Sequence, residues 1–547
     1  MISQRQRVDR RLLWRCLEGM GVHGPALQVL QNMYEDVQLR VRVGGSLGVP
    51  FDSEVGVKQG CPLSPLLFRL FIDRLERWLA RECPTLGARL AGQLLRALFY
   101  ADDVVLLAES PEGLQALLQA LEKFCAANGM LVNLRKSNIV RFGGGAGGAP
   151  PAPFRYCGSE LEVKDGYAYL GLPFSGSTAL PAAALANRLG RARKAIFAVN
   201  GRCAALGVHN VDLRLHLFDT LAASVLSHGC EVWGPDLVGT ASRTGDFAAG
   251  VAEAQLHRPM LRMVLGVNKP TSVCMMMREL NREPFKVFWM RMAAKLWNRA
   301  LQRGPQDWLR LALVANVQLA ADAQVPARAR QRLWAFHFVG GMAALGIQAM
   351  GPAGPQPICV TPARRAMLEK WEGREWDRVR WEGGGRPAWA DSPLAVRAAP
   401  ASFSQGFKLL VYDRWMARGG DWVRKESWTY HLQGRSDVCT VAKFRLGDHW
   451  LNVQRERLRG VARAERCCPR CPGVVEDEMH IMECPLYSGP RQRFLLACGG
   501  FVASDAGMRA AMNGTERAFW VALARFLHDC MRGREDFTNQ APPAVPS

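Results

Sequence analysis

The sequence lacks the apolar segments that mark secreted and membrane proteins. Residues 1–7 are mostly polar or charged, so the chain does not open on the apolar core of a secretory signal. The longest stretch without a charged residue, residues 333–363, is interrupted by glycines, prolines and Gln348. It falls short of the about 20 continuous apolar residues that a membrane span needs. We therefore expect an intracellular protein, nuclear or cytoplasmic, with no membrane partner.

Acidic residues are scarce relative to basic ones. The 49 Asp and Glu residues face 70 Lys and Arg residues, so the formal charge is 70 − 49 = +21 with histidine neutral. This excess predicts a polyanionic partner, and nucleic acid is favoured over an anionic membrane surface. With 49% hydrophobic and 22% charged residues the chain is not globally disordered. Its 547 residues predict about three or four domains.

Cysteine is also sparse. The 16 cysteines mostly stand singly in apolar runs, which indicates reduced, buried thiols and excludes a disulfide-rich scaffold. One group near the carboxyl end differs, because Cys468 and Cys471 are followed by His480 and Cys484. Three thiolates and one imidazole at this spacing form a closed tetrahedral set for a structural zinc ion, with no open position for catalysis. Cys467 could replace Cys468, but only Cys468 keeps the two-residue gap to Cys471.

The first third of the chain alternates between helical and extended patterns. Residues 11–34 predict two helices, and residues 38–51 predict a hairpin whose Arg40 and Arg42 face either solvent or phosphate. A glycine-containing loop then leads into a helix, for which we expect Ser64 as the N-cap and Pro65 as the first residue. The backbone N–H groups at the start of this helix could bind an anion such as a phosphate. On these residues alone, phosphate contact is less favoured than an ordinary loop before a helix.

Two adjacent acids, Asp102 and Asp103, stand between two short apolar runs. The pattern predicts a tight hairpin with both carboxylates at its turn. Neighbouring carboxylates beside an apolar sheet repel each other and resist desolvation unless a cation neutralises them. A divalent metal ion would do so. The alternative is an exposed turn without a function, and the residues alone favour that alternative.

The middle of the chain, from about residue 185 to 334, predicts mostly helices. Basic residues recur along its first segment, and such a face is either solvated or in contact with nucleic acid. These residues are Arg188, Arg191, Arg193, Lys194 and Arg202.

Four segments, in order, resemble the later palm motifs of reverse transcriptases from non-LTR (LINE-type) retrotransposons. They are GVKQGCPLSPLLFRLFIDRLERWL (56–79), FYADDVVLLAES (99–110), GMLVNLRKSNIV (129–140) and YLGLPF (169–174). Residues 217–234 and 277–297 are similar to the helices that follow the palm in this family, and residues 467–487 resemble its zinc-binding segment.

The resemblance implies an α+β fold: part of a right-hand polymerase palm, then a mainly helical thumb and linker region, then a small zinc-binding segment. Combined with the Gly/Pro-rich breaks, it predicts six regions. These are a partial palm (1–175), a helical thumb-like and connecting region (176–350), a Gly/Pro-rich linker (351–395), a helical aromatic-rich segment (396–460), a zinc-binding segment (461–495), and a carboxy-terminal helix and tail (496–547).

Catalytic roles follow from the resemblance. Asp102 and Asp103 would help to hold two Mg²⁺ ions, and Lys136 would donate a proton to the leaving pyrophosphate. Gln59, Gly60 and Tyr100 would line the nucleotide and template pocket. The primer grip would comprise Tyr169, Leu170 and Gly171. The implied partners are an RNA template, a DNA primer and deoxynucleoside triphosphates.

One element of the family pattern is missing. A palm also needs an earlier aspartate, in a motif of the form Asp-x-x-Lys-Ala-Phe/Tyr-Asp-x-Val, and Val8 matches the end of that motif. The metal-binding aspartate would then fall before Met1, while its second aspartate falls on Gln6. We therefore expect either a truncated element product or a gene-model fragment, inactive alone. The alternatives are a non-catalytic nucleic-acid-binding remnant or domesticated protein, and an intron maturase, which would not ordinarily end in this zinc segment.

Overall fold

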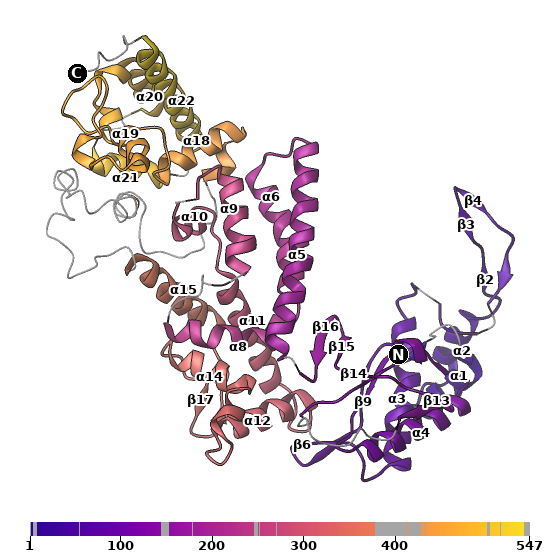
Figure 1. Ribbon diagram of the computed structural model, residues 1–547. Coiled ribbons are helices and arrows are strands. Elements are labelled where there is room, and N and C mark those ends of the chain that lie inside the picture. Colours follow the sequence, from indigo (N-terminus) through magenta and orange to yellow (C-terminus); the bar gives the residue numbers. More distant parts are fainter. Residues whose placement is uncertain are drawn as a thin grey trace. The chain divides into compact units, whose positions relative to one another are not determined.

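The computed structural model describes most of the chain. The described residues are 2–3, 8–143 except 54 and 59, 153–244 except 178, 250–377 except 251 and 270, 412, 428–499 except 433, and 504–540 except 515. They divide into two compact units (Figure 1). Unit 1 is Met1–Ala183 with Gly304–Ala315, and unit 2 is Ala184–Arg303 with Asn316–Ser547. Residues 378–395 of the predicted linker, most of its neighbour 396–427 and residues 144–152 of the Gly/Ala/Pro run lie outside the described residues.

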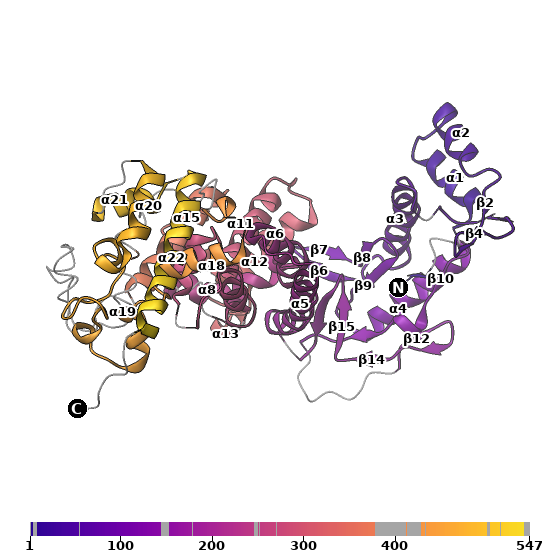
Figure 2. The ribbon, with the colours of Figure 1, turned by 90° about the horizontal axis from the view of Figure 1, so that it is seen from above.

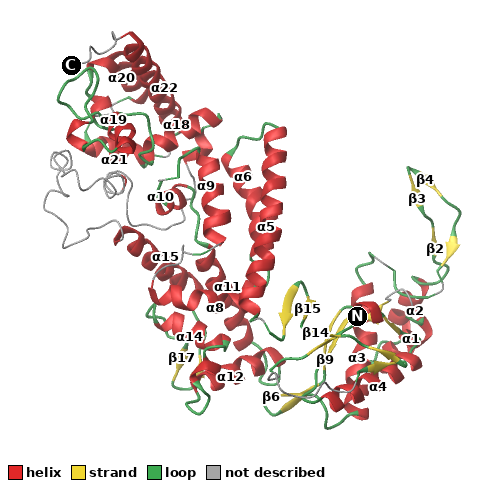
Figure 3. Ribbon diagram, in the orientation of Figure 1, coloured by secondary structure: helices red, strands yellow, loops and turns green. Residues whose placement is uncertain are grey.

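Unit 1 combines short strand pairs with four α-helices that lie wholly within it among the described residues (Figure 3). The helices are α1 (Arg10–Gly19), α2 (Gly24–Asn32), α3 (Ser64–Glu82) and α4 (Pro111–Ala127). Side chains cap two of them, because Asp9 accepts from the Arg11 and Leu12 N–H groups and Ser110 accepts from the Gly113 N–H group. The two helices predicted within residues 11–34 are confirmed by α1 and α2.

The core of unit 1 lies where α3 packs beside α4. Apolar residues at helical spacing turn one face of each helix inward. The buried side chains include Leu67, Phe71, Ile72 and Leu75 of α3 and Leu117, Leu121 and Phe124 of α4. The Trp78 indole donates a hydrogen bond to the Ala120 carbonyl at 3.0 Å, which ties the two helices together. Figure 2 shows this helical layer beside the strands β8 and β9.

The strands of unit 1 form separate two-stranded pairs. The antiparallel pairs are β1 (Ile2–Ser3) with β10 (Leu131–Val132), β2 (Gln38–Leu39) with β5 (Phe51–Asp52), β3 (Arg42–Val43) with β4 (Ser46–Leu47), β6 (Ala88–Leu90) with β7 (Gln93–Leu95), β8 (Ala97–Tyr100) with β9 (Asp103–Leu106), β12 (Arg155–Tyr156) with β13 (Ser159–Glu160), and β15 (Gly166–Tyr169) with β16 (Leu172–Ser175). One pair is parallel, β11 (Ile139–Val140) with β14 (Val163–Lys164). A short 3-10 helix, η2 (Leu134–Lys136), precedes β11.

Unit 2 is mainly helical in its described part, as predicted for the region after the palm. Its first part contains α5 (Leu180–Ala205, which begins in unit 1), α6 (Val211–Phe218), the π-helical turns η3 (Asp219–Ala223) and η4 (Glu253–His257), α7 (Ser224–Leu226), α8 (Cys230–Thr244), α9 (Arg258–Leu265), α10 (Val273–Glu279), α11 (Phe285–Leu301), α12 (Trp308–Ala321, shared with unit 1), α13 (Ala327–Arg330), α14 (Trp334–Ala343), β17 (Met350–Gly351), β18 (Gly354–Pro355) and α15 (Val360–Asp377). Helix α8 packs against α11 and α14 around fully buried tryptophans such as Trp233 and Trp289, whose rings meet edge-on at 4.8 Å.

The described carboxy-terminal part of unit 2 consists mainly of helical segments, the longest of which is α22. These are η7 (Trp428–His431), α18 (Arg435–Arg445), α19 (Asn452–Arg455), η8 (Glu456–Arg459), η9 (Arg463–Glu465), η10 (His480–Met482), η11 (Pro485–Tyr487), α20 (Ser488–Cys498), α21 (Asp505–Met512) and α22 (Arg517–Gln540). Helix α22 packs against both α18 and α20. None of the described helices has the length and apolar character needed to cross a membrane.

Candidate functional site

The two adjacent acids lie at a hairpin turn, as predicted. Strands β8 and β9 pair with Tyr100 opposite Asp103, so Ala101 and Asp102 form the turn. Ala101 has a φ of +55°, a left-handed conformation that L-residues rarely adopt. Such strain is sustained only where the surrounding structure holds it, and it recurs at functional sites.

The two carboxylates are half-buried rather than fully exposed. The Oδ1 atom of Asp103 is buried and has no hydrogen-bond partner within the described part of the chain. A buried carboxylate oxygen without a donor is unfavourable unless a cation meets it. This orphaned oxygen fits a divalent metal ion, and it weakens the interpretation of an exposed turn without a function.

Two tyrosines lie within electrostatic reach of the same carboxylate. Tyr167 and Tyr169 alternate along β15 and therefore share one face. Burial, and after it the charge of Asp103, raises the pKa of both phenols. The β15–β16 turn follows directly, with Leu170 and Gly171 at positive φ values of 50° and 78°. The predicted primer-grip residues thus end one strand and form a tight turn next to it.

The remaining palm residues differ in placement. Gly60 is exposed with a φ of +85°, which glycine adopts without strain. Tyr100 is 60% exposed at the end of β8. Lys136 ends η2 and is exposed to solvent. Gln59 lies outside the described residues.

The predicted cap of helix α3 is wrong. The helix begins at Ser64 itself, with Leu63 at the N-cap position and Pro65 inside the first turn. The Ser64 hydroxyl is buried and lies 3.1 Å from the Tyr34 hydroxyl. A buried hydroxyl needs a hydrogen-bond partner. Because Tyr34 supplies one from a distant segment, the serine side chain does not cap its own helix.

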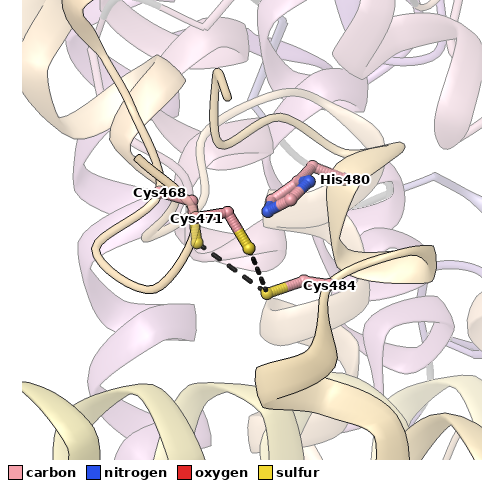
Figure 4. A group of neighbouring side chains, drawn as sticks. All are labelled: Cys468, Cys471, His480 and Cys484. Carbon is pink, nitrogen blue, oxygen red and sulfur yellow. Dashed lines mark hydrogen bonds between the residues drawn. The ribbon is translucent and has the colours of Figure 1, made fainter. Parts of the chain in front are cut away.

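The predicted metal ligands come together in unit 2. The ligand atoms of Cys468, Cys471, His480 and Cys484 all lie within 4.8 Å of one another (Figure 4). The sulfurs of Cys468 and Cys471 each lie 3.8 Å from that of Cys484. Tetrahedral ligands about 2.3 Å from a zinc ion would have sulfurs about 3.8 Å apart. Both ring nitrogens of His480 are buried and have no hydrogen-bond partner among the described residues. A metal ion would satisfy one of them, because a histidine ligand binds the metal through a single ring nitrogen. The four residues therefore fit a zinc ion.

Local hydrogen bonds shape this cluster. The Cys468 N–H group donates to the Val474 carbonyl at 2.8 Å, which closes the turn that carries Cys471. Asp477 accepts from the His480 N–H group at 2.9 Å and fixes the start of η10. Cys467 instead donates its thiol to the Ala464 carbonyl at 3.3 Å. The preference for Cys468 over Cys467 agrees with this geometry.

A buried ion pair supports the cluster, and no local pattern in the sequence predicts it. Glu476, fully buried, accepts hydrogen bonds from Arg534 of α22 at 2.8 and 3.0 Å. The Glu476 carboxylate also accepts hydrogen bonds from the Tyr487 hydroxyl at 3.2 Å and from the Asn452 N–H group at 2.8 Å. Glu476 stands in an acidic run and Arg534 on an amphipathic helix. Both patterns are typical of solvated charges, so no local signal separates this pair from surface residues.

Comparison with known proteins identifies the family to which most of unit 1 is similar. A family model described as "Reverse transcriptase (RNA-dependent DNA polymerase)" matches residues 6–174. The chain is 34% identical over 176 residues to a Pol polyprotein from the type-2 retrotransposable element R2DM of Drosophila melanogaster, a match that covers 30% of this chain and 16% of the relative. It is 38% identical over 108 residues to a Pol polyprotein from the retrotransposable element R2 of Nasonia vitripennis, covering 20% and 10%.

Residues 6–174 are therefore a reverse transcriptase domain. This domain is homologous to the RNA-directed DNA polymerases of non-LTR retrotransposons, which confirms the predicted family. The family implies a divalent metal ion, a nucleic-acid template and deoxynucleoside triphosphates. The matches span less than a fifth of the length of these two relatives.

Proposed function

We propose that the chain acts as an RNA-directed DNA polymerase module of a non-LTR retrotransposon, with Asp102 and Asp103 as ligands of two Mg²⁺ ions. The observation that carries this proposal is the buried, unpartnered Oδ1 of Asp103 at the hairpin turn of a reverse transcriptase domain. Divalent ions bound there would activate the primer 3′-hydroxyl and neutralise the leaving pyrophosphate in an in-line displacement.

The protein's own residues would position the reactants. Gly60, with its exposed backbone, and Tyr100, with its exposed ring, would line the nucleotide and template pocket together with Gln59. Lys136, exposed at the end of η2, would protonate the pyrophosphate. The tight turn of Tyr169, Leu170 and Gly171 would hold the primer end beside Asp103.

We also propose that Cys468, Cys471, His480 and Cys484 hold one structural zinc ion. The sulfur separations of 3.8 Å support a tetrahedral site. Because all four positions are filled by side chains, the ion would stabilise the fold and leave no coordination position for a substrate.

A ternary-complex assay tests the polymerase function. The full chain is mixed with Mg²⁺ and an RNA template annealed to a DNA primer that ends in a dideoxynucleotide, so that no chemistry is needed. We expect the next complementary deoxynucleotide, and no other, to slow dissociation of the duplex by about tenfold. Asp103→Asn should lose this effect, while Asp73→Asn, on the exposed Asp73–Arg77 pair of α3, should keep it. An equal effect of all four nucleotides would contradict the proposal.

A second candidate is a non-catalytic nucleic-acid-binding protein. Four cationic side chains of α5 are exposed, and they favour this candidate. They are Arg191, Arg193, Lys194 and Arg202. Such a protein would bind the same duplex with a strong dependence on salt but without any response to the complementary nucleotide. The assay above therefore separates the two functions.

A further inference from the structure

Arg10, the first residue of α1, binds the segment that leads into α3. Its Nε donates to the Gly56 carbonyl at 3.1 Å, and its Nη1 donates to the Tyr34 carbonyl at 3.0 Å. Its Nη2 reaches the Ser53 hydroxyl at 3.4 Å and the Val55 carbonyl at 3.5 Å. One planar guanidinium thus spans acceptors on two separate stretches of the chain, a task that suits the fixed fork of arginine.

Tyr34 holds the same segment together with Arg10, and we call these two side chains the anchor. Its ring is 3% exposed and lies under the Arg10 guanidinium at 5.2 Å and the Lys58 ammonium at 5.5 Å. Its hydroxyl lies 3.1 Å from that of Ser64, the first residue of α3. Trp14 of α1 meets the same ring edge-on at 5.7 Å. The ring therefore connects α1, the segment before α3 and the start of α3.

The anchored segment needs external support to keep one shape. Gly56 and Gly60 have φ values of +83° and +85°, and glycine loses more conformational freedom on ordering than other residues. Few backbone hydrogen bonds hold the described residues of the segment. They include Gly56 N–H to the Val8 carbonyl at 2.8 Å and Cys61 N–H to the Lys58 carbonyl at 3.3 Å. Charge-assisted hydrogen bonds from Arg10 to the segment are stronger than these neutral ones.

We infer that Arg10 and Tyr34 are positioning residues, which fix the segment around Gly56 and Lys58 so that Gly60 meets the template base and incoming nucleotide in one geometry. This inference rests on the proposed function, which places Gly60 at the nucleotide and template pocket. Neither residue needs to touch substrate, because both act through the backbone of the segment and through Ser64.

Hydrogen exchange tests the anchor itself. In Arg10→Met we expect the amides of Gly56 and Cys61 to exchange about tenfold faster or more, since the lost charged hydrogen bonds allow local opening. Amides in the middle of α4 should be unchanged. Arg11→Met is the matched control, because Arg11 is the next residue, is exposed and carries the same charge. Tyr34→Phe, which removes only the hydroxyl, should speed exchange at Ser64 and provides a variant that keeps the core packed.

A template-base probe tests the positioning role. A 2-aminopurine at the first unpaired template position should change its fluorescence on binding wild type and Arg11→Met. With Arg10→Met we expect that change to be lost at saturating duplex, while the duplex affinity falls by no more than about threefold. Arg10→Lys should restore part of the fluorescence change, because lysine keeps the positive charge but lacks the planar set of N–H donors of the guanidinium group.

The outcomes separate the anchor from the function. Unchanged exchange at Gly56 and Cys61 in Arg10→Met would overturn the inference, and so would faster exchange with an unchanged fluorescence signal. Suppose that exchange becomes faster as expected, but that wild type binds no template–primer duplex. The proposed function and the positioning role would then both be wrong, while the structural role of Arg10 and Tyr34 would be supported.

Discussion

Arg445 and Glu279 form a buried two-point ion pair, although they are 166 residues apart. The Arg445 Nε and Nη2 atoms donate to the two carboxylate oxygens at 2.7 and 2.9 Å, and both side chains are almost fully buried. Tyr412 donates its hydroxyl to the same carboxylate at 2.7 Å, and the Trp428 indole does so as well. The pair joins α10 to α18 inside unit 2, across predicted region boundaries.

Breaking this ion pair should lower the free energy of unfolding of unit 2. Arg445→Met leaves an uncompensated buried carboxylate, and we expect a loss of about 3–5 kcal/mol in the free energy of unfolding. Urea denaturation followed by tryptophan fluorescence measures it. Glu369→Gln, in the exposed Arg365–Glu369 pair, is the control and should cost no more than about 0.5 kcal/mol. Equal stability of both variants would show that the buried pair contributes nothing.

The same carboxylate should make stability depend on pH. Burial alone would raise the pKa of Glu279, but Arg445 and the hydrogen bonds from Tyr412 and Trp428 hold it below the ordinary 4.5. A lowered folded pKa means that the stabilisation is complete above pH 4.5 and is lost as the pH falls through the folded value. Denaturation midpoints between pH 6 and pH 3 should therefore fall more steeply in wild type than in Glu279→Gln. Parallel slopes would contradict this assignment.

Metal analysis should find one zinc ion per chain. Cys471→Ser and His480→Ala each remove a ligand, so we expect both to lose the ion and to unfold at lower temperature. Cys467→Ser should retain it, because that thiol bonds to the Ala464 carbonyl outside the cluster. Mass spectrometry of the purified chain, together with thermal unfolding, makes the comparison. Stoichiometric zinc in Cys471→Ser would disprove the ligand set.

The Glu476–Arg534 pair should raise the zinc affinity of the site, although neither residue is a zinc ligand. Arg534→Met leaves Glu476 buried without its cation, and we expect zinc affinity to fall by about 10–100-fold. Arg532→Met, two residues earlier on α22 and 71% exposed, should bind zinc like wild type. Competition with a chromogenic chelator measures both affinities. A normal affinity in Arg534→Met would limit the pair to a role in packing.

Local features of the site could be predicted from the sequence. The Asp102–Asp103 turn follows from two flanking apolar runs, and the cluster from Cys468 to Cys484 follows from the spacing of its ligands. Both depend on residues that are neighbours in the chain. The cap at Ser64 was predicted wrongly, because its hydroxyl partner comes from Tyr34, 30 residues away.

Longer-range contacts could not be predicted for the same reason. Nothing near Glu279 or Arg445 distinguishes them from solvated charges, and only folding brings them together. The six-region division and the roles of the individual palm residues stay predictions. The expectation that the chain is inactive alone also stays a prediction.

Direct measurement of divalent metal binding tests whether Asp102 and Asp103 are metal ligands. Mn²⁺ binding to the full chain, with the dideoxy-terminated template–primer and the complementary nucleotide, can be followed by electron paramagnetic resonance. We expect bound Mn²⁺ in wild type and in Asp73→Asn. In Asp102→Asn and Asp103→Asn we expect an affinity at least about tenfold weaker, because each variant loses an anionic ligand. Equal Mn²⁺ binding in all four proteins would contradict this expectation.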